Sequence, residues 1–312
     1  MTRLLVVGGI NMDYVFEAPC LPRHGETLGG QSFRRAPGGK GADQAVAATR
    51  LGAETWLVGC AGDDAEGREL LAHLRAEGVR TDHVAMTSEA PTGAAAVFAC
   101  LGESAVTVVP GANHRLTAAH VRAAEPLFAQ SDVVLAELGI PSSAAMEAAE
   151  LAHRFGKPFL LTPSPAGAVP PELARRVHLF LANQHELRSA FGDGDGNGDG
   201  DGGDGNVEGG DDWRALLARW PGRIVVTRGS EGAAHVDAHG TLHEQPAFHV
   251  PVLDTTGAGD AFAAALAVHW SLGIPEAMRR ACAVAALAVR GFGSQSTLPT
   301  RQELSDFLET AG

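Results

Sequence analysis

The sequence predicts an α/β fold with a mostly parallel central sheet, and two observations support this prediction. Short apolar segments alternate with longer alanine-rich segments along most of the 312 residues. The first kind has the length of buried strands and the second the spacing of helices, so together they form βαβ units. Glycine-containing and polar turns follow several apolar segments, at the strand ends where parallel sheets bind ligands. Helices are therefore expected on both faces of one central sheet.

Strands and helices are predicted in alternation from the N-terminus onward. The predicted strands are Leu4–Val7, Thr55–Val58, Val133–Leu135, Phe159–Leu161, Leu179–Leu181 and Ile224–Thr227. The predicted helices are Gln44–Leu51, Gly67–Glu77, Ser143–Arg154 and Ala261–Trp270. Strands that are joined through a helix run parallel, which is why the order of these segments favours a parallel sheet.

Two segments interrupt this alternation. Tyr14–Arg35 and Gly93–Val109 are strand-like but have no helix within them, and the second alternates so that one face is polar. We expect these lid segments, about residues 13–36 and 92–109, to pair as a small antiparallel sheet. Such a sheet would stand off the main domain as a lid over an active site. Irregular surface loops are the alternative.

The net charge of −13 is unevenly distributed along the chain. Residues 193–212 contain eight acidic side chains and no basic one, which leaves −5 for the rest. An acidic chain is a poor match for nucleic acid, so no nucleic-acid partner is expected. No apolar run approaches the ~20 residues that span a bilayer, and Leu4–Ile10 is too short for a signal-peptide core. The sequence therefore predicts a cytoplasmic protein with no membrane partner.

Residues 192–211 form a glycine- and aspartate-rich insert in what is otherwise a single α/β domain over residues 1–312. The insert has almost nothing to bury, so we predict that it is a disordered excursion from the surface. Calcium binding is the alternative, because several residues have the spacing of a calcium loop. These residues are Asp193, Asp195, Asn197, Gly198, Asp199, Asp201 and Asp204. Any glycine/aspartate repeat produces this spacing, so disorder is the favoured interpretation.

The segment from Asp254 to Asp260 carries the strongest chemical signal. Its small residues Gly257, Ala258 and Gly259 let backbone N–H groups face outward where a helix begins. Unpaired amides and the helix dipole both favour a bound anion such as a phosphate group. Asp260 then stands where a carboxylate can orient a hydroxyl aimed at that phosphate. The motif therefore suits phosphoryl transfer, and an ordinary helix cap is the alternative.

Two segments nearer the N-terminus predict a site for a polar ligand. Gly8–Asp13 follows the first strand, where Asn11 and Asp13 can hydrogen-bond a ligand such as a sugar; a capped turn is the alternative. Pro37–Gln44 runs into a helix, and its glycines allow close approach of the backbone while Lys40 offsets anionic charge. Neither segment matches the G-x-G-x-x-G or Walker A pattern.

Two further turns follow predicted strands in the C-terminal half. Asn183 and Glu186 lie at the start of one turn and could hold magnesium through its water ligands. Thr227–Gly232 contains glycines that suit a turn facing a phosphate group. Both turns are expected at the same edge of the sheet as the sugar-binding segments.

Taken together, these motifs resemble the ribokinase family of sugar and nucleoside kinases, also called the phosphofructokinase-B family. The resemblance extends from Leu4 to about Leu308 apart from the insert, and both signature regions, Gly38–Gln44 and Asp254–Asp260, are present. It implies a ribokinase-like three-layer sandwich with a small β-sheet lid. It also implies transfer of the γ-phosphoryl group of MgATP to a primary hydroxyl, most simply O5 of D-ribose. The alternatives are a nucleoside, fructose or 2-keto-3-deoxygluconate acceptor, or a catalytically silent sugar or nucleotide sensor.

The resemblance implies a role for each residue of these motifs. Asp260 would be the catalytic base, and the amides of Gly257, Ala258 and Gly259 would form an anion hole. The residues implied to line the sugar site are Asn11, Asp13, Gly39, Lys40, Asp43, Glu137 and Asp260. The residues implied to bind ATP are Asn183, Thr227, Gly229, Gly232 and Gly259. A carboxylate at a helix N-terminus is a weak base, so we expect Asp260 mainly to orient the hydroxyl.

Two metal ions and a second subunit are also implied. Magnesium would be organised by Asn183 and Glu186 through water. A monovalent cation, usually potassium, would lie beside the anion hole, and its implied ligands are Asp254, Thr256, Gly293 and Thr297. Relatives pair their lids between subunits, so we expect a homodimer. Phe16, Val97 and Val106 are the residues expected on the apolar outer face of the lid.

The sequence departs from the family pattern at three places. Asp43 stands where ribokinases usually have Asn, and an ionised Asp can only accept hydrogen bonds, whereas Asn also donates. The strand end Thr162–Ala166 replaces Asn-Pro-Ala-Pro-Ala, and Ala182 replaces the Pro before the magnesium-associated Asn. The chemistry is therefore expected to be intact, while Asp43 leaves a different sugar open.

Overall fold

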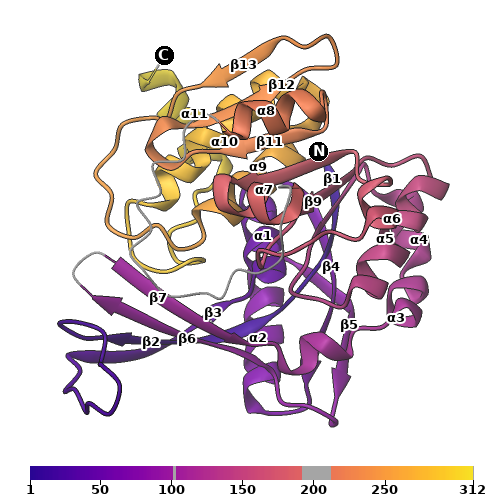
Figure 1. Ribbon diagram of the computed structural model, residues 1–312. Coiled ribbons are helices and arrows are strands. Elements are labelled where there is room, and N and C mark those ends of the chain that lie inside the picture. Colours follow the sequence, from indigo (N-terminus) through magenta and orange to yellow (C-terminus); the bar gives the residue numbers. More distant parts are fainter. Residues whose placement is uncertain (101–102, 192–211, 312) are drawn as a thin grey trace.

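The computed structural model of the protein describes residues 1–100, 103–191 and 212–311. The insert at 192–211 lies outside these ranges, and with it the predicted disorder and the calcium-loop alternative. Within the described residues, the chain forms a large central sheet with helices on both faces and a smaller sheet that projects from one end (Figure 1).

The central sheet has nine strands in the described part of the chain, in the order β13-β12-β11-β10-β9-β8-β1-β4-β5. They are β1 (Arg3–Val7), β4 (Glu54–Gly62), β5 (Arg80–Thr87), β8 (Val133–Glu137), β9 (Phe159–Thr162), β10 (Leu179–Asn183), β11 (Ile224–Thr227), β12 (Ala233–Val236) and β13 (Leu242–Gln245). The strands from β11 to β5 are parallel, whereas β12 and β13 are antiparallel additions at one edge. All six predicted strands are confirmed.

Successive side chains of β1 enter two different hydrophobic clusters, as the period of a strand requires. Leu4 and Val6 pack into a cluster with helices of one face, whereas Leu5 and Val7 pack into a cluster with helices of the other. The first face carries α1 (Lys40–Arg50), α2 (Ala65–Ala76), α9 (Ala258–Val268), α10 (Ile274–Ala288) and α11 (Arg301–Thr310). The second carries α3 (Ala118–Ala123), α4 (Glu125–Gln130), α5 (Ser142–Arg154), α6 (Pro171–Ala174), α7 (Gln184–Phe191) and α8 (Asp212–Arg219). The predicted three-layer arrangement is therefore confirmed.

The predicted helices correspond to α1, α2, α5 and α9 with small shifts of their ends. The largest shift is in α1, which begins four residues before the predicted Gln44. Helix α9 begins at Ala258 and ends at Val268, while Trp270 starts the short 3₁₀ helix η3 (Trp270–Leu272). Two more 3₁₀ helices, η1 (Gly111–Arg115) and η2 (Gly229–Glu231), follow β7 and β11.

The lid sheet consists of β3 (Ser32–Gly38), β2 (Asn11–Glu17), β6 (Gly93–Cys100) and β7 (Glu103–Val109), in that order. It projects below the central sheet in Figure 1. The outer pairs are antiparallel, but β2 and β6 run parallel, so the expectation of an antiparallel sheet is wrong at its centre. Both strands leave the main domain from the same edge and in the same direction, which makes them parallel.

The two faces of the lid sheet differ from expectation. Val15, Ala95 and Val97 form a small buried cluster on one face. Phe16 is on the other face, where its ring lies 5.1 Å from that of Phe33 and is partly exposed. Val97 is therefore not an outer-face residue and does not share a face with Phe16, because neighbouring positions of β2 and β6 alternate. Val106, directly opposite Val97, lies on the face of Val97 but at the exposed edge strand.

Candidate active site

The predicted site residues gather at the carboxyl ends of the parallel strands, on the side of the lid sheet. Asn11 and Asp13 lie on β2, just after β1, and Lys40 is the first residue of α1. Four further positions come from the ends of other elements. They are Glu137 at the end of β8, Asn183 at the end of β10, Thr227 at the end of β11 and Asp260 in the first turn of α9.

Asp260 is buried at the amino end of α9, with only 7% of its surface exposed. The side-chain amide of Gln44 donates a hydrogen bond to Asp260 Oδ1 at 2.8 Å, and Lys40 Nζ lies 3.9 Å from Oδ2. Burial raises the pKa of Asp260 above its ordinary value, even though Lys40 and Gln44 favour the carboxylate. The expectation of a particularly weak base is therefore wrong, because burial outweighs the favourable helix N-terminus.

The turn before α9 requires glycine at Gly257. Its φ of +77° lies in the left-handed region, and a Cβ atom there would meet Ser294 Cβ at 2.8 Å. A Cβ at Gly259 would meet nothing within 4 Å. Gly259 therefore borders open space, whereas the amide of Ala258 donates to the carbonyl of Thr255 at 3.2 Å. Of the three amides predicted for the anion hole, that of Ala258 is thus already engaged.

A cavity of about 210 Å³ lies directly in front of this turn. Its lining includes Lys40, Asn183, Glu186, Thr227 and Asp260, together with Gly257 and Gly259. Thr162 and Ala182, two of the positions that depart from the family pattern, line the same cavity. Small side chains at these two positions leave the polar groups around Asp260 accessible.

Glu137 is buried and holds the turn that follows β1. Its Oε1 accepts from the Gly9 amide at 2.5 Å, and its Oε2 accepts from the Gly139 amide. Burial raises the pKa of Glu137 to about 7, although both amides favour the ionised form. The sequence-based assignment of Glu137 to the sugar site therefore has a structural basis, because this turn carries the chain into β2.

Two more carboxyl groups, those of Asp13 and Asp43, share this region with very little positive charge. Burial, followed by the nearby Asp260, raises the pKa of Asp13 to about 7. Asp43 is buried, and its Oδ1 accepts from Gln295 Nε2 at 2.7 Å. Burial and then the charges of Asp260 and Asp13 raise the pKa of Asp43 well above its usual range. An environment of this kind favours neutral, hydrogen-bonding carboxyl groups.

Gly39 shows how closely the sugar-site segments approach one another. It has a φ of +94°, and a Cβ atom there would lie 2.6 Å from the amide nitrogen of Asn11. Only glycine fits between the two segments, so the glycines predicted for close approach bring the first turn of α1 against β2.

Asn183 and Glu186 form a reciprocal cap at the start of α7. Asn183 Oδ1 accepts from the Glu186 amide at 2.8 Å, and Glu186 Oε2 accepts from the Asn183 amide at 2.9 Å. This arrangement fixes both side chains at the cavity that contains Asp260, and one carboxylate oxygen of Glu186 is outside this exchange. A carboxylate and an amide that bind through water suit magnesium, which keeps several water ligands.

A larger, mostly apolar cavity of about 440 Å³ adjoins the first one. The predicted ATP-binding residues Thr227, Gly229, Gly232 and Gly259 are part of its lining. Its apolar wall was not predicted, since it comes from residues without a local motif. These are Phe248, Val250, Val252, Phe262, Cys282, Ala285, Ala286 and Val289.

The four predicted ligands of a monovalent cation lie in two loops that are joined by hydrogen bonds. Asp254 Oδ1 accepts from the amide and hydroxyl of Thr256, and its Oδ2 accepts from the Gly293 amide at 2.9 Å. Thr297 donates to the Gly293 carbonyl at 3.0 Å. Burial opposes ionisation of Asp254, but these hydrogen bonds outweigh it and lower its pKa. An ionised carboxylate beside backbone carbonyls suits a monovalent cation.

Three polar residues of the site were not assigned from the sequence. Gln44 contacts Asp260, and Gln295 contacts both Asp43 and His73, the latter at 2.8 Å. Asn113 donates to Asn11 Oδ1 at 2.8 Å and accepts from the Ile10 amide. Gln44 lies inside a motif that the sequence analysis singled out, whereas Asn113 and Gln295 are brought to the site by the tertiary fold.

The fold, with a polar and an apolar cavity beside the buried Asp260, suits a kinase. The chain belongs to the pfkB family of carbohydrate kinases, whose model matches residues 1–301. The chain is 35% identical to ribokinase from Bacillus subtilis over 99% of this chain and 100% of that protein. It is also 35% identical to ribokinase from Haemophilus influenzae over 99% of each chain. A solved structure of Arabidopsis thaliana ribokinase complexed with ribose and ATP matches with a TM-score of 0.84, at 28% identity and 99% coverage of each chain.

Among the described helices, none combines the length and apolarity needed to cross a membrane. The described residues also contain no group of three or more His, Cys, Asp or Glu side chains placed to hold a metal ion.

Proposed function

We propose that the protein transfers the γ-phosphoryl group of MgATP to O5 of D-ribose, giving ribose 5-phosphate and ADP. The observation that carries this proposal is the position of Asp260, buried at the amino end of α9 and at the edge of the 210 Å³ cavity. Sugar-site residues of β2 and α1 lie on one side of it, and the apolar cavity lies on the other. Similarity to two ribokinases, and to a ribokinase complexed with ribose and ATP, supports the choice of substrates.

In the proposed mechanism, Asp260 orients the sugar hydroxyl toward the γ-phosphorus and accepts its proton as the new O–P bond forms. The bond between the γ-phosphorus and the β–γ bridging oxygen breaks, and the negative charge leaves on ADP. Lys40, whose pKa is raised by Asp260, stays protonated and offsets the charge of the phosphoryl group. The amides at the start of α9 contribute in the same way, because phosphoryl transfer depends mainly on positioning and charge neutralisation.

The bound nucleotide would place its base in the apolar 440 Å³ cavity and its phosphates along Thr227, Gly229 and Asn183. Asn183 and Glu186 would hold Mg²⁺ through water, and the ion would neutralise phosphate charge. A monovalent cation at Asp254 and the neighbouring carbonyls would stabilise the turn that precedes α9. Asp254 Oδ2 accepts from the Gly293 amide, so the loops that carry the cation ligands also support Gly257.

The proposed acceptor is compatible with Asp43 in its protonated form, which burial and the neighbouring carboxyl groups favour by raising its pKa. Gln295 donates to Asp43 Oδ1, so the proton belongs on Oδ2, which can then donate to a sugar hydroxyl. A protonated Asp offers one donor and one acceptor, like the Asn that is usual at this position. The alternatives are a nucleoside, fructose or 2-keto-3-deoxygluconate acceptor, and a catalytically silent sensor.

We also propose a homodimer that forms through the lid sheet. The edge strand β7 exposes Val106 and Val108 on one face of the lid sheet, and the other face exposes Val109, Phe16 and Phe33. An edge strand with exposed β-branched residues and a single charged residue, Glu103, is prone to association, and a second copy of the lid would cover it. The predicted cytoplasmic location stays a prediction.

The test is ADP release from MgATP with D-ribose, 2-deoxyribose, fructose, 2-keto-3-deoxygluconate and nucleosides, with and without potassium. Ribose is expected to give the highest kcat/KM, and potassium is expected to raise turnover. Turnover with another sugar but not with ribose would overturn ribose as the acceptor and leave the proposed mechanism intact. No sugar-stimulated turnover with any acceptor would favour the silent sensor.

A further inference from the structure

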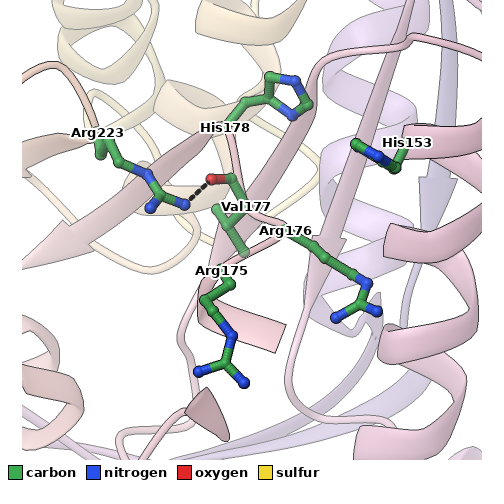
Figure 2. A pocket seen from close by; sticks show the side chains of 6 residues that line it. All are labelled: His153, Arg175, Arg176, Val177, His178 and Arg223. Carbon is green, nitrogen blue, oxygen red and sulfur yellow. Dashed lines mark hydrogen bonds between the residues drawn. The ribbon is translucent and has the colours of Figure 1, made fainter. Parts of the chain in front are cut away.

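A cavity of about 460 Å³ lies at the end of the central sheet opposite the candidate active site. We call it the basic cavity, and its lining residues are His153, Arg175, Arg176, Val177, His178 and Arg223 (Figure 2). His178 directly precedes β10 and Arg223 directly precedes β11, so the cavity lies at the amino ends of these parallel strands. The residues proposed to bind sugar and nucleotide lie at the opposite edge of the sheet, where the parallel strands have their carboxyl ends.

Five of the six lining side chains are basic, although the chain as a whole has a net charge of −13. Figure 2 shows them arranged around the backbone of Val177, with Arg223 on one side and His153 and Arg176 on the other. Arg175 and Arg176 each have one carboxylate at 3.3 Å, from Glu172 and Glu150. Both ion pairs are exposed and therefore weak, so an incoming anion can compete with them.

Arg223 is half-buried, and its charge is not balanced by a carboxylate. Its Nη2 donates to the carbonyl oxygens of Ala174, at 2.7 Å, and of Val177. Among the described residues, no acidic side chain lies within ion-pair distance of Arg223. The carbonyl contacts fix the guanidinium group beside the cavity while leaving its positive charge available.

His178 is held in one orientation next to Arg223. Its Nδ1 accepts from the Phe159 amide at 3.1 Å, which leaves Nε2–H as the donor of the neutral ring. Burial, followed by the positive charges of Arg223 and His153, lowers the pKa of His178. The positive charges around the cavity therefore contribute to the lowered pKa of a histidine that lines it.

We propose that the basic cavity binds a phosphorylated small molecule. Guanidinium groups match the geometry of phosphate oxygens and bind them in bidentate fashion. The volume is within the range of ligand sites, about 300–1,000 Å³, and so exceeds what a single phosphate group needs. The phosphate groups belong either to an inorganic polyphosphate, such as pyrophosphate, or to an organic phosphate, and the test distinguishes these two sources.

The test follows the imidazole NMR signals of His178 and His153, assigned with His178→Gln and His153→Gln variants, while a ligand is added at constant ionic strength. The probes are inorganic phosphate, pyrophosphate, ribose 5-phosphate and, as a carboxylate anion, citrate. These signals report on the basic cavity, whereas a phosphate bound at Asp260 contacts neither histidine. Saturable shifts are expected, with tighter binding of at least one phosphate probe than of citrate.

The double variant Arg175→Gln/Arg176→Gln should weaken this binding about tenfold or more, because two charged hydrogen-bond donors are lost. Arg122→Gln/Arg154→Gln is the matched control, since it also removes two arginines that pair with glutamates but do not line the cavity. Circular dichroism checks that both variants fold. Shifts that do not saturate, that are equal for citrate, or that weaken equally in the control would overturn the proposal. A preference for pyrophosphate or for ribose 5-phosphate would identify the source of the phosphate.

Discussion

At the residue scale, the candidate site is defined by buried carboxyl groups whose protonation the fold controls. Asp13, Asp43, Glu137 and Asp260 lie close together, and burial raises the pKa of each. Lys40 is the one cation that contributes to the shifts of both Asp260 and Glu137. Burial therefore favours the protonated forms of these carboxyl groups more than water would, and the residues should differ in how they respond to substitution.

Asp260→Asn should separate binding from chemistry. The side chain keeps its size and can still contact Gln44, but it can no longer accept a proton from the sugar hydroxyl. We expect kcat to fall about 10³-fold while ribose affinity, measured by calorimetry, stays nearly unchanged. Near-normal turnover would show that Asp260 is not the group that receives the proton.

Asp43→Asn should leave ribose recognition at pH 7 largely intact, with KM within about threefold, because a neutral Asp and an Asn present similar donors and acceptors. As pH rises through the elevated pKa of Asp43, the wild-type carboxyl ionises and loses its donor. Ribose KM of the wild type should therefore rise with pH, whereas that of the variant should not. A changed sugar preference in the variant at pH 7 would mean that Asp43 acts as a carboxylate.

Asp13→Asn should stabilise the unliganded protein at alkaline pH. Folded Asp13 keeps its proton up to about pH 7, whereas in the unfolded chain the proton is lost near pH 4. The folded state therefore binds more protons in this window, and the free energy of unfolding decreases as pH rises from 4 to 7.

Because Asn does not titrate, the variant should lose part of this slope and gain about 2 kcal/mol at pH 8, after allowance for screening. Urea unfolding at pH 4.5 and pH 8 measures the effect, with the exposed Asp82→Asn as a control. An identical slope for Asp13→Asn and wild type would contradict a raised pKa. At pH 8 the ionised Asp13 offers two acceptor oxygens and Asn offers one, so sugar binding should weaken in the same variant while its stability rises.

At the element scale, the loop that leads into α9 packs against the loop that contains Ser294. Gly257 lies against Ser294, whereas Gly259 faces the cavity. Two alanine substitutions only two residues apart should therefore have different effects.

Gly257→Ala should destabilise the fold by about 1–3 kcal/mol, because its φ is positive and its Cβ would collide with Ser294. Gly259→Ala should keep its stability, but its methyl group would occupy the proposed phosphate position and lower kcat/KM for ATP about tenfold or more. Thermal unfolding and steady-state kinetics of both variants provide the comparison. Full activity of Gly259→Ala would place the phosphate elsewhere.

The central strands could be predicted from the sequence because their burial alone determines their residue pattern. The six predicted strands are continuous apolar runs, which is the pattern of a strand buried on both faces. β5 and β13 lie at the edges of the sheet and carry polar residues, so hydrophobic pattern did not identify them. Two features of the site depend on long-range packing and have no local sequence signal. One is the apolar wall contributed by α10 and Val252, and the other is the contact of Gln295 with Asp43.

At the scale of the whole molecule, the lid sheet exposes several apolar side chains to water. Val106 and Val108 are 53% and 46% exposed, although they are β-branched and lie in an edge strand. A homodimer would remove this surface from water, which stabilises the assembly.

Val106→Lys/Val108→Lys should therefore give a monomer, because two charges on the edge strand oppose pairing. Light scattering over a range of protein concentrations measures the mass. Leu272→Lys is the control, since Leu272 is 50% exposed but lies in η3 of the main domain. A wild-type protein that is monomeric at every concentration would contradict the proposal.

The chain passes from β1 into β2 within four residues, and Asn11 and Asp13 belong to β2 itself. In the proposed enzyme, the strand that covers the sugar site would thus also help to bind the sugar. Any displacement of the lid sheet would carry Asn11 and Asp13 with it. In the proposed enzyme, selection of the sugar and shielding of the reaction from water would therefore be coupled, because both depend on the position of β2.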